Sequence, residues 1–216
     1  MSIVYYVIDT ETNGLNCKIH EVNEISIIRC TDRMQLTEFI KCEHPELSSF
    51  DALKITGKTL DDLKKGADKE SVVEKANKFF EEDGLTPAHR CIVGHNIIPF
   101  DKKFLHALWE KCGKAFPANL WLDTITLTTL FLEKYDTSDI KLVKTATGRI
   151  SKKLQDACDM VGVKKYAAAH ASKVDAKNTY LLWRKLVDTY NIDYVDEIKT
   201  FVHEIAQDET DDDFFV

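Results

Sequence analysis

The chain lacks the features that would place it in a membrane, a secretory route or a disulfide scaffold. The sequence of 216 residues contains no apolar run of about 18 residues, so we predict no membrane-spanning helix. No basic segment precedes an apolar one near the N-terminus, so we expect no secretion signal and a cytoplasmic protein, or a nuclear one in a eukaryote. The six cysteines form no C-x-x-C pair, which favours reduced thiols over zinc or disulfides.

Acidic residues outnumber basic ones, and the charge is unevenly distributed along the chain. The formal net charge is −7, and the tail of residues 208–216 carries five acidic residues and no basic one. Residues 141–177 instead hold nine basic residues against three aspartates. A local basic stretch matters more for phosphate binding than the total charge, so the net charge does not exclude a nucleic-acid partner.

Periodicity predicts a mixed α/β domain. Apolar and β-branched strand patterns occupy residues 3–8, 24–30, 34–41 and 91–94, and residues 45–66 are polar and loop-like. Helical stripes occupy residues 71–82, 101–112, 124–134, 151–161, 174–189 and 193–206. Three sequential strands followed by strands alternating with helices indicate a mixed β-sheet flanked by α-helices.

Two carboxylates close the first strand pattern. Asp9 and Glu11 follow a buried apolar run, and strand alternation places them on one side with Thr10 on the other. Paired acids at such a place are costly unless a cation lies between them, so the pair indicates a site for a hard divalent ion. A second D-x-E, Asp68 with Glu70, lies in a lysine-rich segment and is interpreted as a solvated capping turn.

Two further acids begin predicted helices. Asp101 and Asp175 each stand at the head of an apolar helical stripe, where an N-terminal capping role is the simpler alternative. His170 lies five residues before Asp175 in a small-residue segment. His203 and Asp208 repeat that spacing, but no apolar stripe continues beyond them, so the first pair is preferred.

Together these residues resemble the DEDDh branch of the DnaQ-like 3′–5′ exonucleases. The motif D-x-E-T-x-G matches residues 9–14, H-N followed by F-D matches residues 95–101, and H-x-x-x-x-D matches residues 170–175. The resemblance spans residues 3–187. It implies an RNase H-like fold with an exonuclease domain at residues 1–190, a helical extension at 191–207 and a tail at 208–216.

The resemblance also implies the chemistry. Asp9, Glu11, Asp101 and Asp175 would hold two divalent ions, Mg²⁺ with Mn²⁺ as a substitute, and His170 would be the general base. The substrate would be the 3′ end of single-stranded nucleic acid, DNA favoured over RNA, cleaved to 5′-nucleoside monophosphates in proofreading, repair or processing.

Residues beside the acidic motifs would bind the terminal nucleotide. By resemblance these are Thr12, Asn13, Gly14, Leu15, His95, Asn96 and Phe100. Gly14 would let the backbone approach the sugar, and Leu15 would wedge against a base. Ser172 departs from the family, in which many members carry Ala. The basic stretch that includes Lys141 is either a track for the nucleic-acid backbone or a solvated face.

The acidic tail and the overall function each have an alternative. Residues 208–216 are too acidic to pack and end in two phenylalanines, so the tail is expected to be disordered and either recruits a replication or repair protein or only solubilises the chain. A non-catalytic nucleic-acid-binding protein of the same fold is one alternative function. A hydrolase of short oligonucleotides is another.

Overall fold

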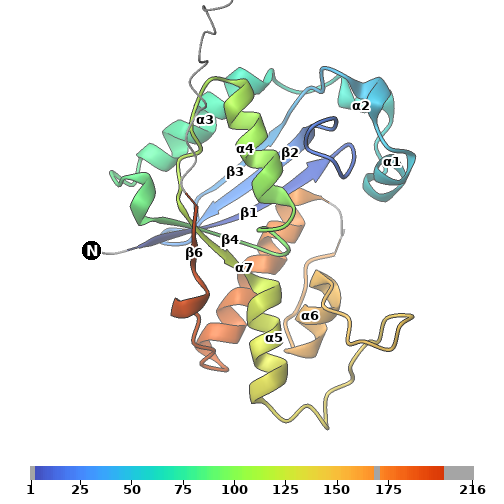
Figure 1. The fold of residues 1–216 in the computed structure, drawn as a ribbon, viewed down its shortest axis with the longest axis vertical. Helices are drawn as coiled ribbons and strands as arrows, with labels where there is room; N and C mark the ends of the chain where they lie inside the picture. Colours follow the sequence, from blue (N-terminus) through green and yellow to red (C-terminus); the bar gives the residue numbers. More distant parts are fainter. Residues whose placement is uncertain (1–2, 168–170, 202–216) are drawn as a thin grey trace, which may run out of the picture.

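A six-stranded mixed sheet forms the centre of the computed structural model, which describes residues 3–167 and 171–201 (Figure 1). The strands are β1 (Val4–Thr12), β2 (Val22–Arg29), β3 (Gln35–Phe39), β4 (Arg90–Gly94), β5 (Leu120–Asp123) and β6 (Lys199–Thr200), in the order β3-β2-β1-β4-β5-β6. The pairs β1–β4 and β4–β5 are parallel, and the other neighbours are antiparallel. The predicted mixed sheet is therefore confirmed.

Helices cover both faces of this sheet (Figure 1). They are α1 (Phe50–Thr56), α2 (Leu60–Leu63), α3 (Lys69–Glu81), α4 (Asp101–Lys111), α5 (Thr124–Lys134), α6 (Leu154–Met160) and α7 (Ser172–Asp188), with short 3₁₀ turns at Pro45–Leu47, Pro87–His89 and Val195–Glu197. The helices α3 and α4 bury their apolar stripes on one face, and α5, α6 and α7 bury theirs on the other. This is the flanked sheet that the helical stripes predict.

The strand β1 is central and buried on both faces. Tyr6 and Ile8 belong to the apolar core under α3 and α4, whereas Val7 belongs to the core under α5 and α7. The sequence of such a strand is a continuous apolar run, because the side chains on each face pack against a layer of helices. The alternation continues to the polar end of β1, and it decides which side of the sheet each carboxylate faces.

Three predictions of secondary structure are wrong. Residues 45–66 contain α1 and α2 in place of a loop, each begun by a side-chain cap from Ser49 or Thr59. The strand β5 was not predicted, because four residues are too few to show a period. Residues 193–201 do not begin a helix: backbone pairing with β5 forms β6 and completes the sheet edge.

Several sequence predictions fall on residues 168–170 and 202–216, outside the described part of the chain. His170, the alternative pair His203 and Asp208, and the acidic tail therefore stay predictions, as do the domain boundaries. Across residues 3–167 and 171–201, every helix is too short or too polar to span a bilayer.

Candidate active site

Strand β1 carries the first two acids. It continues past the predicted end at Ile8 to Thr12, pairing Asp9 with Ser26 and Glu11 with Glu24 of β2 before an irregularity in the pairing. The period of two therefore keeps Asp9 and Glu11 on the same side of the sheet. Both side chains are half-buried, so they remain open to solvent ions.

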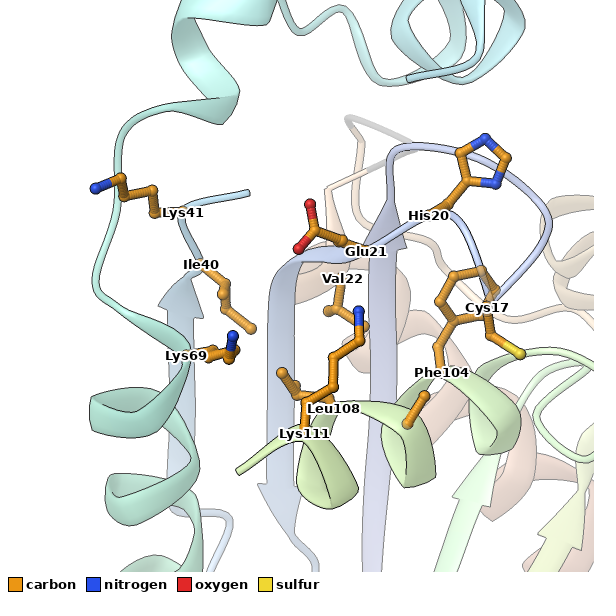
Figure 2. Close-up of a pocket in the computed structure, with 11 residues that line it drawn as sticks. Cys17, His20, Glu21, Val22, Ile40, Lys41, Lys69, Phe104, Leu108 and Lys111 are labelled. Carbon is orange, nitrogen blue, oxygen red and sulfur yellow. The ribbon is translucent and has the colours of Figure 1, made fainter. Parts of the chain in front are cut away.

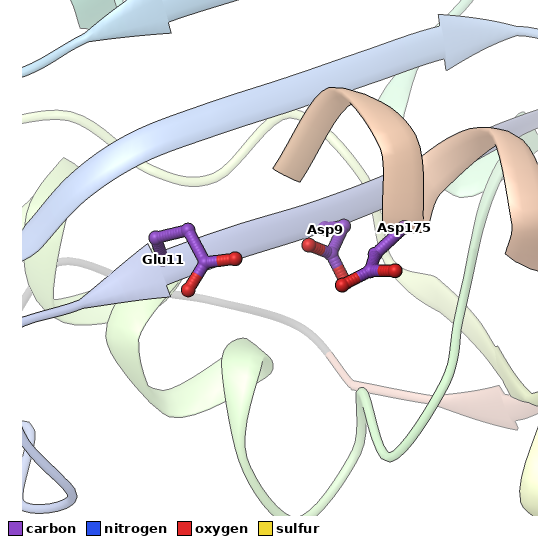
Figure 3. A group of neighbouring side chains, drawn as sticks. All are labelled: Asp9, Glu11 and Asp175. Atoms are coloured by element: carbon purple, nitrogen blue, oxygen red, sulfur yellow. The ribbon is translucent and has the colours of Figure 1, made fainter. Parts of the chain in front are cut away.

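Helix α7 brings the third acid to this pair. The helix packs across β1 and β2, and Asp175 lies in its first turn. One carboxylate oxygen from each of Asp9, Glu11 and Asp175 lies within 4.8 Å of the others. Figure 3 shows the Asp9 and Asp175 carboxylates facing each other, with the Glu11 carboxylate turned toward them. We call these three residues the acidic cluster.

Asp101 approaches from the opposite face. It is buried at the start of α4, and its Oδ1 accepts hydrogen bonds from the Thr10 backbone N–H at 3.2 Å and from the Thr10 hydroxyl at 2.6 Å. These bonds fix the position of the Asp101 carboxylate at the start of α4. Its carboxylate is not within the acidic cluster, but its charge raises the pKa of Asp9.

The negative charges at this end of β1 repel one another. Burial, followed by the charges of Asp101 and Glu11, raises the pKa of Asp9 well above its usual value. Burial and the charge of Glu24 raise the pKa of Glu11 to about 7, and burial raises that of Asp101 to about 7. The ionised forms of these neighbouring acids destabilise one another. A hard divalent cation prefers carboxylate oxygens and would neutralise their charge, so the group suits such an ion. The donor set therefore suits Mg²⁺ or Mn²⁺.

A hydrogen-bonded network behind the acidic cluster was missed by sequence reasoning. Buried Glu24 accepts bonds from the backbone N–H of Ser172 at 3.1 Å and from its hydroxyl at 2.8 Å, which ties β2 to the start of α7. The Lys58 ammonium, from the segment between α1 and α2, lies 3.0 Å from the other Glu24 oxygen. Ser172 is thus more than a small residue, because its hydroxyl helps to position the helix turn that carries Asp175.

This network makes Lys58 the subject of a stability prediction. We expect Lys58→Met to lower the free energy of unfolding by about 3 kcal/mol, because it leaves the buried Glu24 carboxylate unpaired. Adding Glu24→Gln should recover most of that loss. Lys64→Met removes an exposed pair with Asp61 and should cost less than about 1 kcal/mol. Urea denaturation of the wild type and these three variants measures this, and an equal loss in Lys58→Met with and without Glu24→Gln would contradict the network.

Asp123 is a second positioning residue that the sequence interpretation missed. It ends β5, and its carboxylate accepts bonds from the backbone N–H groups of Asn96 at 3.0 Å and Ile98 at 3.2 Å, and from Ile125 at 2.9 Å. One acid thus caps α5 and shapes the segment that leads into Asp101. The signal was an apolar run ended by an acid, the same pattern that identified Asp9.

The loop after β1 is fixed mainly by its own contacts. Asn13 is buried, its amide oxygen accepts from the Glu21 N–H at 2.6 Å, and its amide nitrogen donates to Ser48 Oγ at 3.1 Å. A Cβ on Gly14 would lie 2.2 Å from the His20 ring, so the structure gives packing against His20 as the reason for glycine here. Leu15 is 80% exposed, and its contact with a base stays a prediction.

The motif His95-Asn96 contributes mostly to local structure. His95 Nε2 donates to the carbonyl of Lys152 at 2.8 Å, and its Nδ1 lies 2.9 Å from the Thr124 hydroxyl. Burial lowers the pKa of His95, which keeps the ring neutral. Asn96 is exposed with φ 64°, and half-buried Phe100 packs on Phe104 at 5.1 Å between ring centroids. Substrate contact by His95, Asn96, Phe100 and Thr12 stays a prediction.

Two hollows in the structure differ in volume and in the residues that line them. A groove of about 830 Å³ opens beside Asp175 and is lined by residues of α5, α6 and the segment before α6. A pocket of about 20 Å³ lies under α4, where Figure 2 shows Lys69 and Lys111 at its rim with Cys17 and Glu21. The small pocket cannot hold a nucleotide, and Lys69 is already paired with Glu43 at 2.5 Å. Of these two hollows, the groove is the one lined by a residue of the acidic cluster, Asp175.

The mixed sheet flanked by helices, with Asp9 and Glu11 on its first strand, is the RNase H-like arrangement that the sequence resemblance implies. Residues 6–183 match the family model described as Exonuclease. The chain therefore belongs to this exonuclease family, which confirms the resemblance found in the sequence motifs. No curated protein matches the chain.

Solved structures of exonuclease I are similar in fold. The Escherichia coli enzyme in complex with a dA16 oligonucleotide matches with a TM-score of 0.68 and 18% identity, covering 87% of this chain and 41% of that one. The Methylocaldum szegediense enzyme matches with a TM-score of 0.67 and 20% identity, covering 87% and 40%. The chain thus spans about two fifths of the length of these structures, and at such identity the likeness shows the fold alone.

Proposed function

We propose that the protein is a metal-dependent 3′–5′ exonuclease acting on single-stranded nucleic acid, with DNA favoured over RNA. The observation that carries the proposal is the convergence of Asp9, Glu11 and Asp175, whose oxygens lie within 4.8 Å of one another. Family membership supports a nuclease, and the oligonucleotide bound to the E. coli enzyme supports a single-stranded DNA substrate.

In this proposal Asp9, Glu11 and Asp175 hold one divalent ion, and Asp9 with Asp101 supports a second. Bound there, the ions would supply positive charge that neutralises the phosphate and makes water more acidic. The half-buried cluster suits Mg²⁺, which keeps several waters and needs few protein ligands. Mn²⁺ would substitute because it accepts the same oxygen ligands.

The proposed reaction is hydrolysis of the last phosphodiester. A water oxygen attacks the phosphorus of the terminal nucleotide, the bond from phosphorus to the 3′ oxygen of the preceding nucleotide breaks, and that oxygen takes up a proton. The products are a 5′-nucleoside monophosphate and a strand one nucleotide shorter. His170 would accept the proton of the attacking water, because an imidazole titrates near neutral pH.

The terminal nucleotide would lie against the loop after β1. Exposed Leu15 is available to contact its base, and the backbone of residues 12–14 is held in place by the Asn13 bonds to Glu21 and Ser48. A preorganised loop of this kind lowers the entropy cost of positioning the reacting phosphate.

A time course on 5′-labelled single-stranded DNA and RNA tests the proposal. With Mg²⁺ or Mn²⁺ we expect labelled products to shorten one nucleotide at a time, DNA faster than RNA, and EDTA should stop the reaction. Release of labelled mononucleotide at the earliest times would show attack from the 5′ end and contradict the proposal. Binding without hydrolysis of either strand would favour the non-catalytic alternative.

A further inference from the structure

A projecting hairpin precedes α6 and is ordered by its own backbone bonds. Thr145 N–H donates to the Arg149 carbonyl at 2.8 Å, Gly148 N–H to Thr145 at 2.9 Å, and Ser151 N–H to Val143 at 2.8 Å. Gly148 has φ 77°, which the tight turn requires. Figure 1 shows this segment extending from the body of the domain beside α6. We call residues 141–150 the basic hairpin.

The basic hairpin and the segment after it carry uncompensated positive charge. Residues 140–155 contain five basic residues and no acidic one. Lys141, Lys144 and Arg149 are exposed, and none forms an ion pair with a carboxylate of residues 3–167 or 171–201. The lysines of α3 behave differently, since Lys75 pairs with Glu38 and Lys78 with Glu74. Because no acidic residue lies within residues 140–155, the hairpin and the segment after it present a local net positive charge.

A groove lies next to the base of the hairpin and is lined both by the segment after the hairpin and by the acidic cluster. The lining of the 830 Å³ groove includes Asp175 of the acidic cluster, Lys152 and Lys153 of the segment after the hairpin, and the apolar side chains of Ile125 and Leu154. Its lining also includes the acid Asp156, whose carboxylate accepts a bond from Ser151 at 2.5 Å.

Residues that line the groove are anchored by hydrogen bonds. Gln155 Nε2 donates to Asp175 Oδ1 at 3.2 Å, so α6 is connected directly to the acidic cluster. Lys152 Nζ donates to Thr129 at 2.7 Å, and the Lys152 carbonyl accepts from His95. The peptide that leads from the hairpin into α6 is therefore held against α5, which fixes the base of the hairpin relative to the cluster.

We propose that the groove and the basic hairpin form a track for single-stranded nucleic acid upstream of the cleaved phosphate. Ile125 and Leu154 would contact bases, and Lys153 with the hairpin cations would contact successive phosphates. Charge complementarity and the continuity of the groove with the acidic cluster select this occupant. The proposal rests on the proposed exonuclease function, and it goes beyond that function by naming where the strand lies behind its 3′ end.

Salt-dependent binding tests the track. The test variant is Lys141→Ala/Lys144→Ala/Arg149→Ala, and a control of equal charge change is Lys75→Ala/Lys78→Ala/Lys114→Ala, which alters the opposite face of the sheet. Binding of fluorescent dT20 is measured by anisotropy in EDTA across a salt series. Each phosphate contact contributes about 0.7 to the slope of log K against log salt for single strands. We expect the test variant to lose about 2 from the slope and roughly tenfold in affinity at low salt, and the control to lose neither.

A second measurement separates failure of the track from failure of the proposed function. With Mg²⁺, the test variant should hydrolyse the dinucleotide pdTpdT at the wild-type rate but degrade dT20 about tenfold more slowly at low strand concentration. If the wild type hydrolyses neither substrate and the slope still changes, the exonuclease proposal fails and the track stands. If the wild type is active and the test variant keeps the wild-type slope of log K against log salt, as the control does, the track is overturned.

Discussion

Asp9→Asn is expected to reduce the rate of 3′-end hydrolysis by at least about 10³-fold. Asp9 is central to the proposed metal centre, and an amide supplies neither the negative charge nor both oxygens of the carboxylate. Loss of about 4 kcal/mol of transition-state stabilisation corresponds to this factor. Single-turnover hydrolysis of a 5′-labelled strand in saturating Mg²⁺ measures it. Asp68→Asn, which alters the second D-x-E of the chain, is the matched control and should retain the wild-type rate.

The same substitution should make the metal-free protein more stable. The folded-state pKa of Asp9 is raised by burial and by neighbouring acids, so at pH 8 its ionised form destabilises the fold. Removing the charge should therefore raise the free energy of unfolding in EDTA, as measured by urea denaturation. Equal stability of wild type and Asp9→Asn in EDTA, at every pH, would contradict the electrostatic account of the cluster.

The pH dependence of this difference has a defined sign. Acids with raised pKa values, such as Glu11 at about 7, bind protons more readily in the folded state than in the unfolded state. Lowering the pH from above 7 toward the ordinary glutamate value near 4.5 should therefore stabilise the metal-free wild type at these sites. The advantage of Asp9→Asn should shrink over the same range. It should also shrink on adding Mg²⁺, which stabilises only the protein that binds it.

His170→Ala is expected to lower hydrolysis by about 10²-fold or more, the usual contribution of a general base. The rate of the wild type should rise with pH through the pKa of the base, which is near 6.5 for an unperturbed histidine. That dependence should disappear in the variant, while Mg²⁺ binding and strand affinity remain. His203→Ala repeats the change at the alternative histidine and should leave rate and pH profile unchanged. Equal losses in the two variants would remove His170 from the proposed mechanism.

The acidic cluster was largely predictable because it follows from periodicity. Strand alternation places Asp9 and Glu11 together, and helical stripes place Asp101 and Asp175 at the ends that face the sheet. The structure brings three of these acids within 4.8 Å and places Asp101 behind Thr10. Periodicity could not decide whether Asp101 and Asp175 are metal ligands or helix caps. That choice depends on which residues lie opposite each acid in the folded structure.

The supporting residues were missed because they depend on register and on turn chemistry. Glu24 faces Glu11 only in one alignment of β1 with β2, and a shift of one residue would turn it away. Lys58 reaches Glu24 because α1 and α2 form in a stretch whose composition indicates a loop. Ser172 contacts Glu24 across 148 residues of sequence, a pairing that no local pattern encodes.

We propose that the acidic cluster makes this member of the exonuclease family a metal-dependent enzyme acting at 3′ ends. The most direct measurement is one time course of a 5′-labelled DNA strand with wild type and Asp9→Asn side by side, in Mg²⁺ and in EDTA, after both are shown to bind the strand equally. We predict stepwise shortening from the 3′ end only for the wild type in Mg²⁺. Equal shortening by Asp9→Asn, or by the wild type in EDTA, would contradict the claim.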